Sequence, residues 1–481
     1  MKISPKNSLF TVVAFLLLPP MIFYACGFEK IAGLSVFSST VLLWLTEALP
    51  LPVTGLLVPV LITSYGILPA KESFQAFGSD ILFLFIGCFF LARAMEKHGW
   101  DKRMAYWILS RRFGNTSPAF VITAIALFCW TLSMWISNTA TCAMMTPIAL
   151  GIAAIFREKF SDSTNVKNFE HRLLLTCAFA SSIGGLATPI GSPPNLIALQ
   201  FLRDRGISVN FLDWTIVGLP ISATMLFALL LILRLRYPIE QIDLRDIHEE
   251  FRMKLNQLGH LKREEIQVAS LFSLAVLLWL LPGILSAIIP GFAITEYVTK
   301  YITFSVVGIG VTIVLFMLPS QIQGESNLTW SDANAIDWGT ILLFGGGLSL
   351  GMMLDRTGLA QAFGSAVLPS YPGALLLILI TVVTSVLISE FASNTASAAI
   401  VIPIILGTTA QLNLDINTIE AVVLACAFGA SYGFMLPVST PPNAIVYGTG
   451  KIAAKEMVKS GILFDLTGIL IIVFALWLFY F

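Results

Sequence analysis

The chain has 481 residues, 57% of them hydrophobic and only 12% charged, with a net charge of zero and a mean hydropathy of +0.85. Soluble domains usually carry about 25% charged residues, so this composition excludes an ordinary soluble protein, and the charge balance gives no reason to expect a nucleic-acid partner. Apolar runs of roughly 20 residues recur from end to end, and each is long enough to cross a ~30 Å hydrocarbon core as a helix. The sequence therefore predicts an all-α polytopic membrane protein.

Four transmembrane helices are predicted before the first polar motif. They lie at 8–27, 31–50, 51–68 and 80–97. Residues 1–30 thus comprise an N-terminal tail and the first helix. Glu47 stands at a turn beside two prolines, which favours a solvated carboxylate at the membrane surface over a functional intramembrane acid. The basic, amphipathic segment 98–112 then suits a helix lying along the cytoplasmic surface.

Two polar clusters interrupt the apolar runs that follow. The run 117–156 carries Ser137-Asn138-Thr139 in its middle. About fifty residues later, the run 173–202 carries Thr188-Pro189-Ile190-Gly191-Ser192-Pro193-Pro194-Asn195. A proline pair breaks a transmembrane helix, and the freed carbonyl groups need a partner or water. We therefore predict a broken helix at 173–202.

The positive charges predict the topology. Lys and Arg concentrate in 98–112, 157–172 and 234–263, which the positive-inside rule places in the cytoplasm. These three segments fall on one side only if 117–156 enters and leaves the membrane on the same face, as a re-entrant hairpin. Residues 237–266 are then a cytoplasmic linker between two halves of the chain.

Residues 31–236 and 267–481 are predicted to be two copies of one repeat. Segments 80–87 and 339–346 align at an offset of 259 residues, and the polar motifs align at offsets of 256 and 248. With five spans in each copy, the two repeats have opposite orientations in the membrane. The prediction is about eleven transmembrane helices plus two re-entrant hairpins, in inverted five-helix repeats. The N-terminus is cytoplasmic and the C-terminus extracytoplasmic.

The second copies of the motifs stand in matching surroundings. A second hairpin, 372–412, carries Ser393-Asn394-Thr395, and a second broken helix, 420–449, carries Leu436-Pro437-Val438-Ser439-Thr440-Pro441-Pro442-Asn443. A single polar cluster could have a purely structural role, joining neighbouring helices by hydrogen bonds. Helix-breaking clusters in corresponding places of two hydrophobic halves indicate the binding site of a secondary transporter.

The chemistry of the motifs favours a sodium-coupled anion. Asparagine carbonyls, hydroxyl groups and unwound backbone carbonyls are ligands for hard cations, and helices that start after each break point positive dipole ends at the same space. Neither motif contains Lys or Arg, and the nearest cation after the first tip is Arg157. Helix ends supply about half a charge each, so a dianion needs further compensation, and co-bound sodium ions would supply it.

Other activities have less support. An intramembrane enzyme needs a nucleophile and a base, or metal ligands, converging within the spans, and we predict no catalytic residue. Glu390 precedes the second tip and has Met134 as its counterpart in the first repeat, which favours a structural or gating role over proton binding. A passive anion channel is a further alternative, but duplicated hairpins favour alternating access over an open pore.

With these motifs the sequence resembles the divalent anion/sodium symporter family, the sodium-dicarboxylate transporters. The paired Ser-Asn-Thr tips, the paired Pro-Pro breaks and the segment from Thr46 to Thr54 carry the resemblance, which covers nearly the whole chain. It implies a homodimer in which a scaffold domain holds the partner while a transport domain moves as an elevator. Both domains would lie in lipid, in the cytoplasmic (inner) membrane.

The resemblance also assigns residues to ligands. It implies two sodium sites, the first at Ser133, Ser137, Asn138 and Gly191 and the second at Ser389, Ala392, Asn394 and Ser439. It implies substrate contacts from Ser137, Asn138, Thr139, Ser192, Pro193, Ser393, Asn394, Thr395, Thr440 and Pro441. Ser389 stands where the family often has threonine, and the hydroxyl group is kept.

The expected function is sodium-coupled symport of a C4 dicarboxylate such as succinate, malate or fumarate. Family members that carry sulfate often have inserted soluble domains, and this chain has none. The alternatives are exchange of di- or tricarboxylates and sodium-coupled transport of an inorganic dianion such as sulfate.

Overall fold

The computed structural model describes residues 5–27, 30–111, 117–159, 163–240, 245–321, 324–367, 373–412 and 414–481. In these residues the secondary structure consists of 22 α-helices and two short 3-10 helices, with one isolated β-bridge between Pro319 and Ser326. The predicted all-α fold is confirmed. Residues 1–4 of the predicted tail, 241–244 of the linker and 372 of the second hairpin lie outside the described residues.

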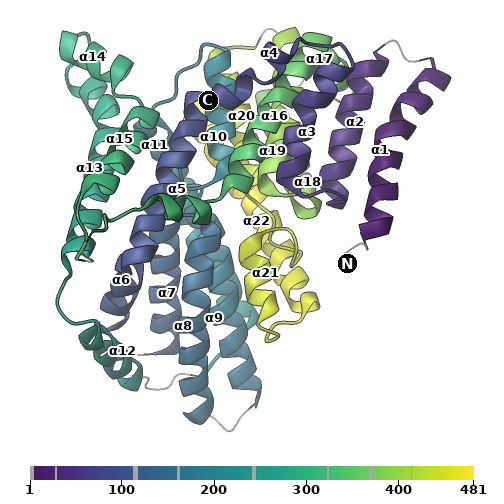
Figure 1. Ribbon diagram of the computed structural model, residues 1–481. Helices are drawn as coiled ribbons and strands as arrows, with labels where there is room; N and C mark the ends of the chain where they lie inside the picture. The colour runs from purple at the N-terminus through teal and green to yellow at the C-terminus, as the bar shows by residue number, and fades with distance from the viewer. Residues whose placement is uncertain are drawn as a thin grey trace.

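Figure 1 shows the helices in their order along the chain. Those of the first half are α1 (Pro5–Ala25), α2 (Ile31–Thr46), α3 (Leu51–Ser64), α4 (Ala70–Ser73), η1 (Gln75–Gly78), α5 (Asp80–His98), α6 (Trp100–Leu109), α7 (Pro118–Ser133), α8 (Asn138–Lys159), α9 (Ser163–Gly184), α10 (Pro193–Asp204) and α11 (Phe211–Arg236). Those of the linker and second half are α12 (Arg245–Gln257), α13 (Arg263–Ile288), α14 (Ala293–Tyr301), α15 (Phe304–Met317), η2 (Trp330–Ala335), α16 (Trp338–Thr357), α17 (Leu359–Val367), α18 (Ala374–Phe391), α19 (Asn394–Gln411), α20 (Ile416–Ala430), α21 (Pro441–Gly448) and α22 (Ala454–Tyr480).

Each predicted hairpin range contains two helices separated by a short tip. In the first, α7 ends at Ser133 and α8 begins at Asn138; in the second, α18 ends at Phe391 and α19 begins at Asn394. Helix α9 packs against both α7 and α8, and α20 packs in the same way against α18 and α19. The two tips therefore lie beside the two broken helices.

Each predicted broken helix consists of a longer and a shorter helix. Helices α9 and α10 are separated by residues 185–192, and α20 and α21 by 431–440. The proline pairs occupy the first positions of α10 and α21, where a missing backbone N–H costs nothing. The prolines thus start the second helix of each pair.

Helices α3 and α15 cross over to the other repeat, and glycines permit the close approach. Helix α3 packs on α16 and α15 packs on α5. A Cβ atom at Gly346 would lie 2.4 Å from the Cα atom of Gly55, and one at Gly87 would lie 2.6 Å from the carbonyl carbon of Gly308. Backbone contacts this short exclude any side chain, so each repeat holds a helix of the other.

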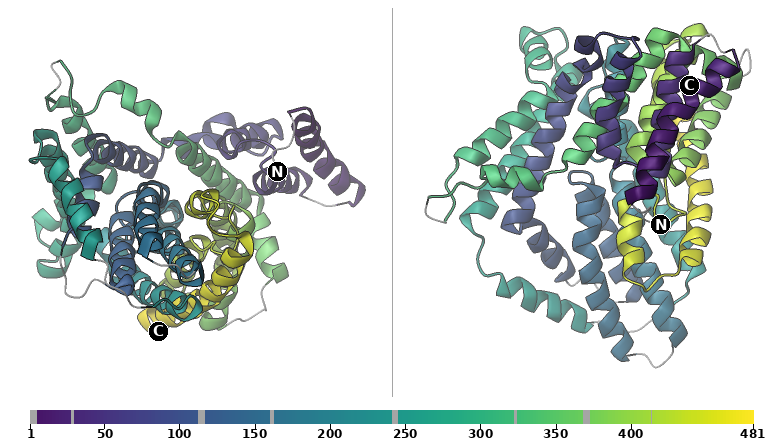
Figure 2. Two further views of the ribbon diagram at one scale, coloured as in Figure 1. Left: turned by 90° about the horizontal axis from the view of Figure 1, so that it is seen from below. Right: turned by 45° about the vertical axis from the view of Figure 1, so that its right-hand side comes forward.

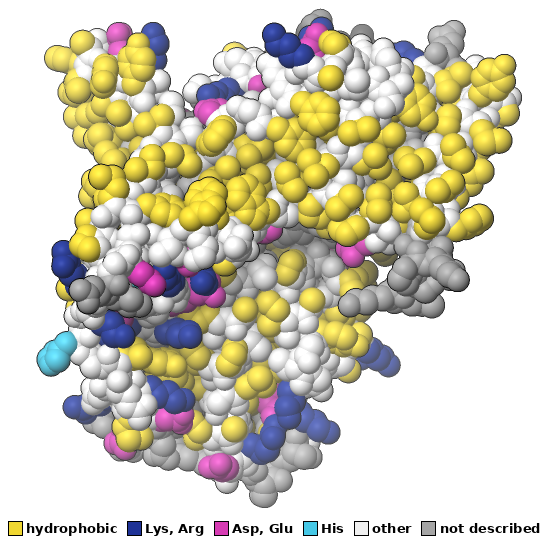
Figure 3. All heavy atoms as spheres, viewed as in Figure 1, with side chains coloured by type: hydrophobic (Ala, Val, Ile, Leu, Met, Phe, Trp, Pro, Cys, Tyr) yellow, Lys and Arg dark blue, Asp and Glu magenta, His cyan; other side chains and the backbone are white. Residues whose placement is uncertain are grey.

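The two hairpins, the two broken helices, α11 and α22 pack together. We call α7–α11 and α18–α22 the bundle, and α1–α5 and α13–α16 the frame. Within the bundle, α21 packs on α8 and α9, α10 packs on α19 and α20, and α11 packs on α22. Seen from below, the bundle lies between α13–α15 on one side and α1–α3 on the other (Figure 2). Hydrophobic side chains cover most of the upper part of the face in Figure 3, whereas charged side chains gather over its lower part.

The membrane-spanning helices can be compared with the predicted ones. Helices α8, α11, α13, α16, α18 and α22 are each long and apolar enough to cross a membrane, and α14 with α15 would add one span bent by 70°. The apolar helix α15 is therefore preceded by the separate short helix α14. The predicted linker contains helix α12, and α13 already begins at Arg263. Because several other apolar helices are shorter, the number of spans stays a prediction.

Candidate binding site between the two repeats

A cavity of about 310 Å³ lies where the two tips meet the two helix breaks. Its wall includes residues of both repeats, with α3, α5 and α16 of the frame closing one side. All ten residues predicted to contact substrate line it: Ser137, Asn138, Thr139, Ser192, Pro193, Ser393, Asn394, Thr395, Thr440 and Pro441. The structure thus brings together residues from four separate segments.

Four helices begin at this cavity. Asn138 starts α8, Pro193 starts α10, Asn394 starts α19 and Pro441 starts α21, and all four residues line the cavity wall. The N-terminus of a helix carries about half a positive charge, from backbone N–H groups without a partner in the helix. Four such ends around one small space make it suitable for a negatively charged ligand.

Serine hydroxyl groups of the two Ser-Asn-Thr motifs cap α8 and α19. Ser137 Oγ accepts a hydrogen bond from the Ala140 N–H at 3.2 Å, and Ser393 Oγ accepts one from the Ala396 N–H at 3.2 Å. Capping holds each serine at the tip and leaves its own hydroxyl proton available to donate. A carboxylate in the cavity could accept that proton from either tip.

The first predicted sodium site is a cluster of oxygen atoms. The inward-facing atom of the Asn138 amide lies 2.6 Å from Ser133 Oγ, 3.0 Å from the Ser181 carbonyl oxygen and 3.3 Å from the Gly191 carbonyl oxygen. If that atom is the amide nitrogen, it donates to these acceptors. If it is the amide oxygen, four oxygens converge with the Ser133 hydroxyl as their one donor, and a hard cation would satisfy the oxygens that this donor leaves without a partner. Ser137, the fourth predicted ligand, lies at the adjacent tip.

The second predicted sodium site has the same core and one added acid. Ser389 Oγ lies 2.9 Å from Asn394 Oδ1 and donates to the Ala430 carbonyl oxygen at 2.6 Å. Ala392 could contribute only its backbone carbonyl. The Ser439 hydroxyl lies 2.7 Å from a carboxylate oxygen of Glu390. A carboxyl group therefore lies next to this site and has no counterpart in the first.

Glu390 itself holds the second helix break in place. Its fully buried carboxylate accepts hydrogen bonds from the N–H groups of Met435 and Leu436, at 2.9 and 3.1 Å, besides its contact with Ser439. These contacts agree with the structural role favoured from the sequence. Glu47 ends α2 in a left-handed conformation and is exposed, as expected for a residue in a turn.

Two further asparagines stabilise the breaks, and sequence reasoning missed their role. Asn195 Nδ2 donates to the carbonyls of Gly185 and Thr188, both at 2.8 Å. At the same offset of 248 residues, Asn443 Nδ2 donates to the carbonyls of Gly433 and Leu436, at 2.9 and 3.1 Å. The freed carbonyls of both breaks are thus satisfied by the last residue of each Pro-Pro-Asn motif. The recurrence of this asparagine at the same offset in both motifs was the sequence signal that could have indicated its structural role.

The described part of the cavity wall has one acidic side chain and lacks a cationic one. Among the residues that the structure describes, the cavity wall contains no Lys, Arg or His, and its one charged side chain is Asp337, which accepts a hydrogen bond from the Thr340 N–H at the start of α16. Sequence reasoning missed Asp337 because it lies in a loop outside the motifs. A dianion here would be held by helix ends and hydroxyl groups, without a fixed cation.

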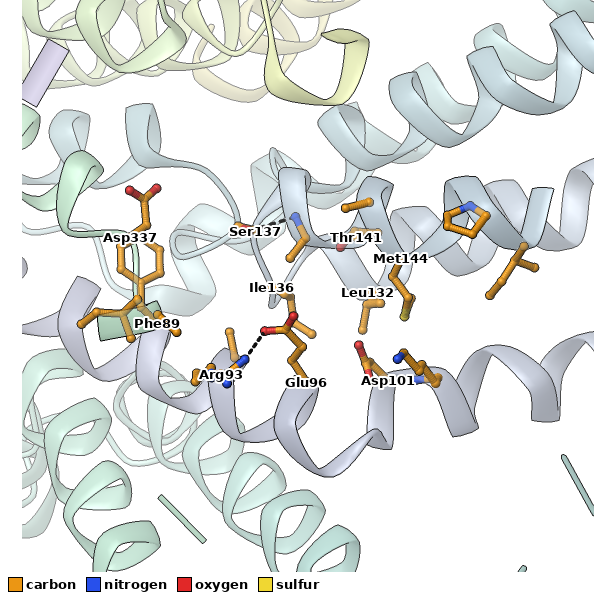
Figure 4. Close-up of a pocket in the computed structure, with 18 of the residues that line it drawn as sticks. Phe89, Arg93, Glu96, Asp101, Leu132, Ile136, Ser137, Thr141, Met144 and Asp337 are labelled. Carbon is orange, nitrogen blue, oxygen red and sulfur yellow. Dashed lines mark hydrogen bonds and ion pairs between the residues drawn. The ribbon is translucent and has the colours of Figure 1, made fainter. Parts of the chain in front are cut away.

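A second cavity of about 560 Å³ shares Phe89, Ala92, Ser137 and Asp337 with the first. Figure 4 shows it between α5, α6 and the arms of the first hairpin, with Arg93 paired to Glu96 at 3.0 Å. Asp101 also lines it, and burial raises the pKa of Asp101 to about 6, although the adjacent Lys102 opposes the shift. Residues of α6, within the basic segment 98–112, form part of the lining of this charged cavity.

The comparisons with known proteins concern almost the whole chain. A family model described as "Sodium:sulfate symporter transmembrane region" matches residues 7–480. A protein of Staphylococcus saprophyticus named sodium-dependent dicarboxylate transporter SdcS is 33% identical over 451 residues, which cover 90% of this chain and 83% of that protein. The SdcS protein of Staphylococcus aureus strain USA300 is 34% identical over 447 residues, with the same coverage. The YdaH transporter of Alcanivorax borkumensis has a similar fold, with a TM-score of 0.52 at 15% identity over 84% of this chain and 85% of that one.

Proposed function

Because the chain belongs to the sodium:sulfate symporter family, whose members are membrane transporters and not enzymes, we propose that it carries a C4 dicarboxylate together with sodium ions across the cytoplasmic membrane. The observation that carries the proposal is the single cavity at which four helices begin and both Ser-Asn-Thr tips meet. The names of the SdcS relatives support sodium and dicarboxylate as the transported species. Succinate, malate and fumarate are the candidate substrates.

The doubled site favours a dicarboxylate over sulfate. Each repeat offers one tip and one helix break, so a linear dianion can place one carboxylate at each, with Ser137 and Ser393 as donors. Sulfate carries its charge on one compact group, so it can fully contact the tip and helix break of only one repeat. Sodium ions at the two oxygen clusters would supply the positive charge that the cavity wall lacks.

The test is uptake of radiolabelled succinate by purified protein in liposomes, with and without an inward sodium gradient. We expect accumulation only with the gradient. Counterflow of succinate without sodium would instead establish an exchanger, and competition by sulfate at concentrations similar to malate would establish an inorganic dianion carrier. Absence of all three activities would contradict the proposal.

An elevator motion is the mechanism that the packing supports. The bundle contains both tips and both breaks, whereas close glycine contacts join α3 to α16 and α5 to α15 within the frame. In an elevator motion the bundle would move as a unit against the frame, carrying its site from one side to the other. The homodimer, with the frame at its interface, remains a prediction from the family resemblance.

Two ion pairs hold the bundle against the frame in this conformation. At the end of α10, both Nη atoms of Arg203 donate to the Asp80 carboxylate of α5 at 2.8 Å. The neighbouring Arg205 lies 3.3 Å from the Asp355 carboxylate of α16. An elevator movement of α10 must break both contacts. We expect the double variant Arg203→Gln, Arg205→Gln to populate the opposite conformation more than the unmodified protein does.

Spin labels on Ser208→Cys and Phe74→Cys would measure that shift as a second, longer distance whose population increases. Both positions are exposed, and Cys26, the one exposed cysteine among the described residues, would be replaced by serine. The control is Arg356→Gln, which removes a similar pair with Glu72 that joins α16 to α4 within the frame. An unchanged distance distribution in the double variant would exclude a role for the pairs in holding this state.

A further inference from the structure

An apolar groove of about 590 Å³ lies on the outer side of the first hairpin. One wall is a helical stripe on α6, formed by Trp100, Met104, Trp107 and Ile108 and continued beyond the helix by Arg111. The facing wall is a stripe on α7, formed by Phe120, Thr123, Ala124, Leu127, Phe128 and Thr131. Phe272 of α13 also contributes to the lining.

The groove opens to its surroundings along most of its length. Trp107 is 48% exposed and Leu127 is 47% exposed, although both side chains are apolar. A surface of this kind next to transmembrane helices is covered by lipid. The stripe from residue 100 to 111 would span roughly 16 Å at 1.5 Å per residue, so the groove is long and narrow.

Charge is confined to one end of the groove. Arg111 is the one charged residue in the lining, and its guanidinium lies 4.4 Å from the centre of the Trp107 ring. Within the described part of the chain no carboxylate is paired with it. It follows the amphipathic helix α6, on the side of the protein that carries the basic loops. A guanidinium at the end of an apolar groove and at a membrane surface matches a phosphate attached to an acyl chain.

We propose that this groove binds one anionic phospholipid, with an acyl chain between α6 and α7 and the phosphate on Arg111. The far end of the groove is lined by Trp135, which precedes the first tip and also lines the candidate binding cavity. Bound lipid therefore contacts a residue of the cavity wall. This last step rests on the proposed function, whereas lipid binding itself does not.

The test is native mass spectrometry of the purified protein, first stripped of lipid and then incubated with phosphatidylglycerol or phosphatidylcholine. We expect one phosphatidylglycerol to be retained at concentrations at which phosphatidylcholine is not. Arg111→Gln removes the charge-assisted contact and should weaken phosphatidylglycerol binding about tenfold. Ala124→Trp fills the groove and should abolish binding of that lipid.

Matched controls separate the groove from general effects of charge and size. Arg252→Gln removes an exposed arginine on α12, and Ala223→Trp adds a large side chain at an exposed position on α11; neither residue lines the groove. Both should bind phosphatidylglycerol as the unmodified protein does. Equal retention of the two lipids, or unchanged binding in Arg111→Gln and Ala124→Trp, would overturn the proposal. Because the readout is bound lipid, its failure is distinguishable from a failure to transport succinate.

Discussion

Replacing Asn138 with alanine is expected to reduce sodium-driven succinate uptake to the level of protein-free liposomes. Asn138 begins α8, lines the binding cavity and places its amide among Ser133, Ser181 and Gly191. A lost contact to a charged ligand costs roughly 1.5–3 kcal/mol, or about 10- to 150-fold in affinity. The Asn138 side chain would contact both sodium and the substrate, so its removal would weaken the binding of both ligands.

Asn394→Ala is expected to have the same effect in the second repeat, where Asn394 begins α19 and pairs with Ser389. The measurement is initial uptake across a range of sodium concentrations, together with thermal unfolding of the purified protein. Asn256→Ala, at an exposed position of α12, is the matched control and should transport normally. Uptake like that of the unmodified protein in either tip variant would contradict the assignment of the site.

Gly185→Ala is expected to reduce sodium-driven uptake at least tenfold by crowding the first oxygen cluster. A Cβ atom at this position would lie 2.6 Å from Asn138 Oδ1 and 2.9 Å from the Gly191 carbonyl oxygen. Real contacts of this kind do not occur, so either the tip or the helix break must shift. Since cation ligands need their oxygens at fixed distances, the apparent affinity for sodium should fall more than the affinity for succinate.

The matched variant for that prediction is Gly151→Ala in α8. No atom lies within 4 Å of a Cβ at Gly151, and alanine favours a helix over glycine by about 1 kcal/mol. This variant should transport normally and unfold at a slightly higher temperature. If Gly185→Ala kept its sodium dependence, the oxygen cluster around Asn138 would not be the site of coupling.

Much of the fold was predictable because the same motifs occur in both halves of the sequence. The Ser-Asn-Thr and Pro-Pro-Asn motifs recur in matching order, and each interrupts an apolar run. Two matching interruptions predict the same local structure in both halves. The structure has a helix end at every one of these places. The bend between α14 and α15 and the helix α12 inside the linker were not predicted, because neither belongs to the duplicated pattern.

The sequence by itself predicted the class of protein, ten of the residues of the cavity wall and the need for a cation other than Lys or Arg. These follow from composition, from motifs read in pairs and from the family they resemble. Only the tertiary structure decided how the breaks are held, since the partners of Asn195, Asn443 and Glu390 depend on which carbonyl and N–H groups the folded chain brings near them. It also decided which surfaces stay open, because the groove between α6 and α7 exists only once these two helices are packed at a given separation.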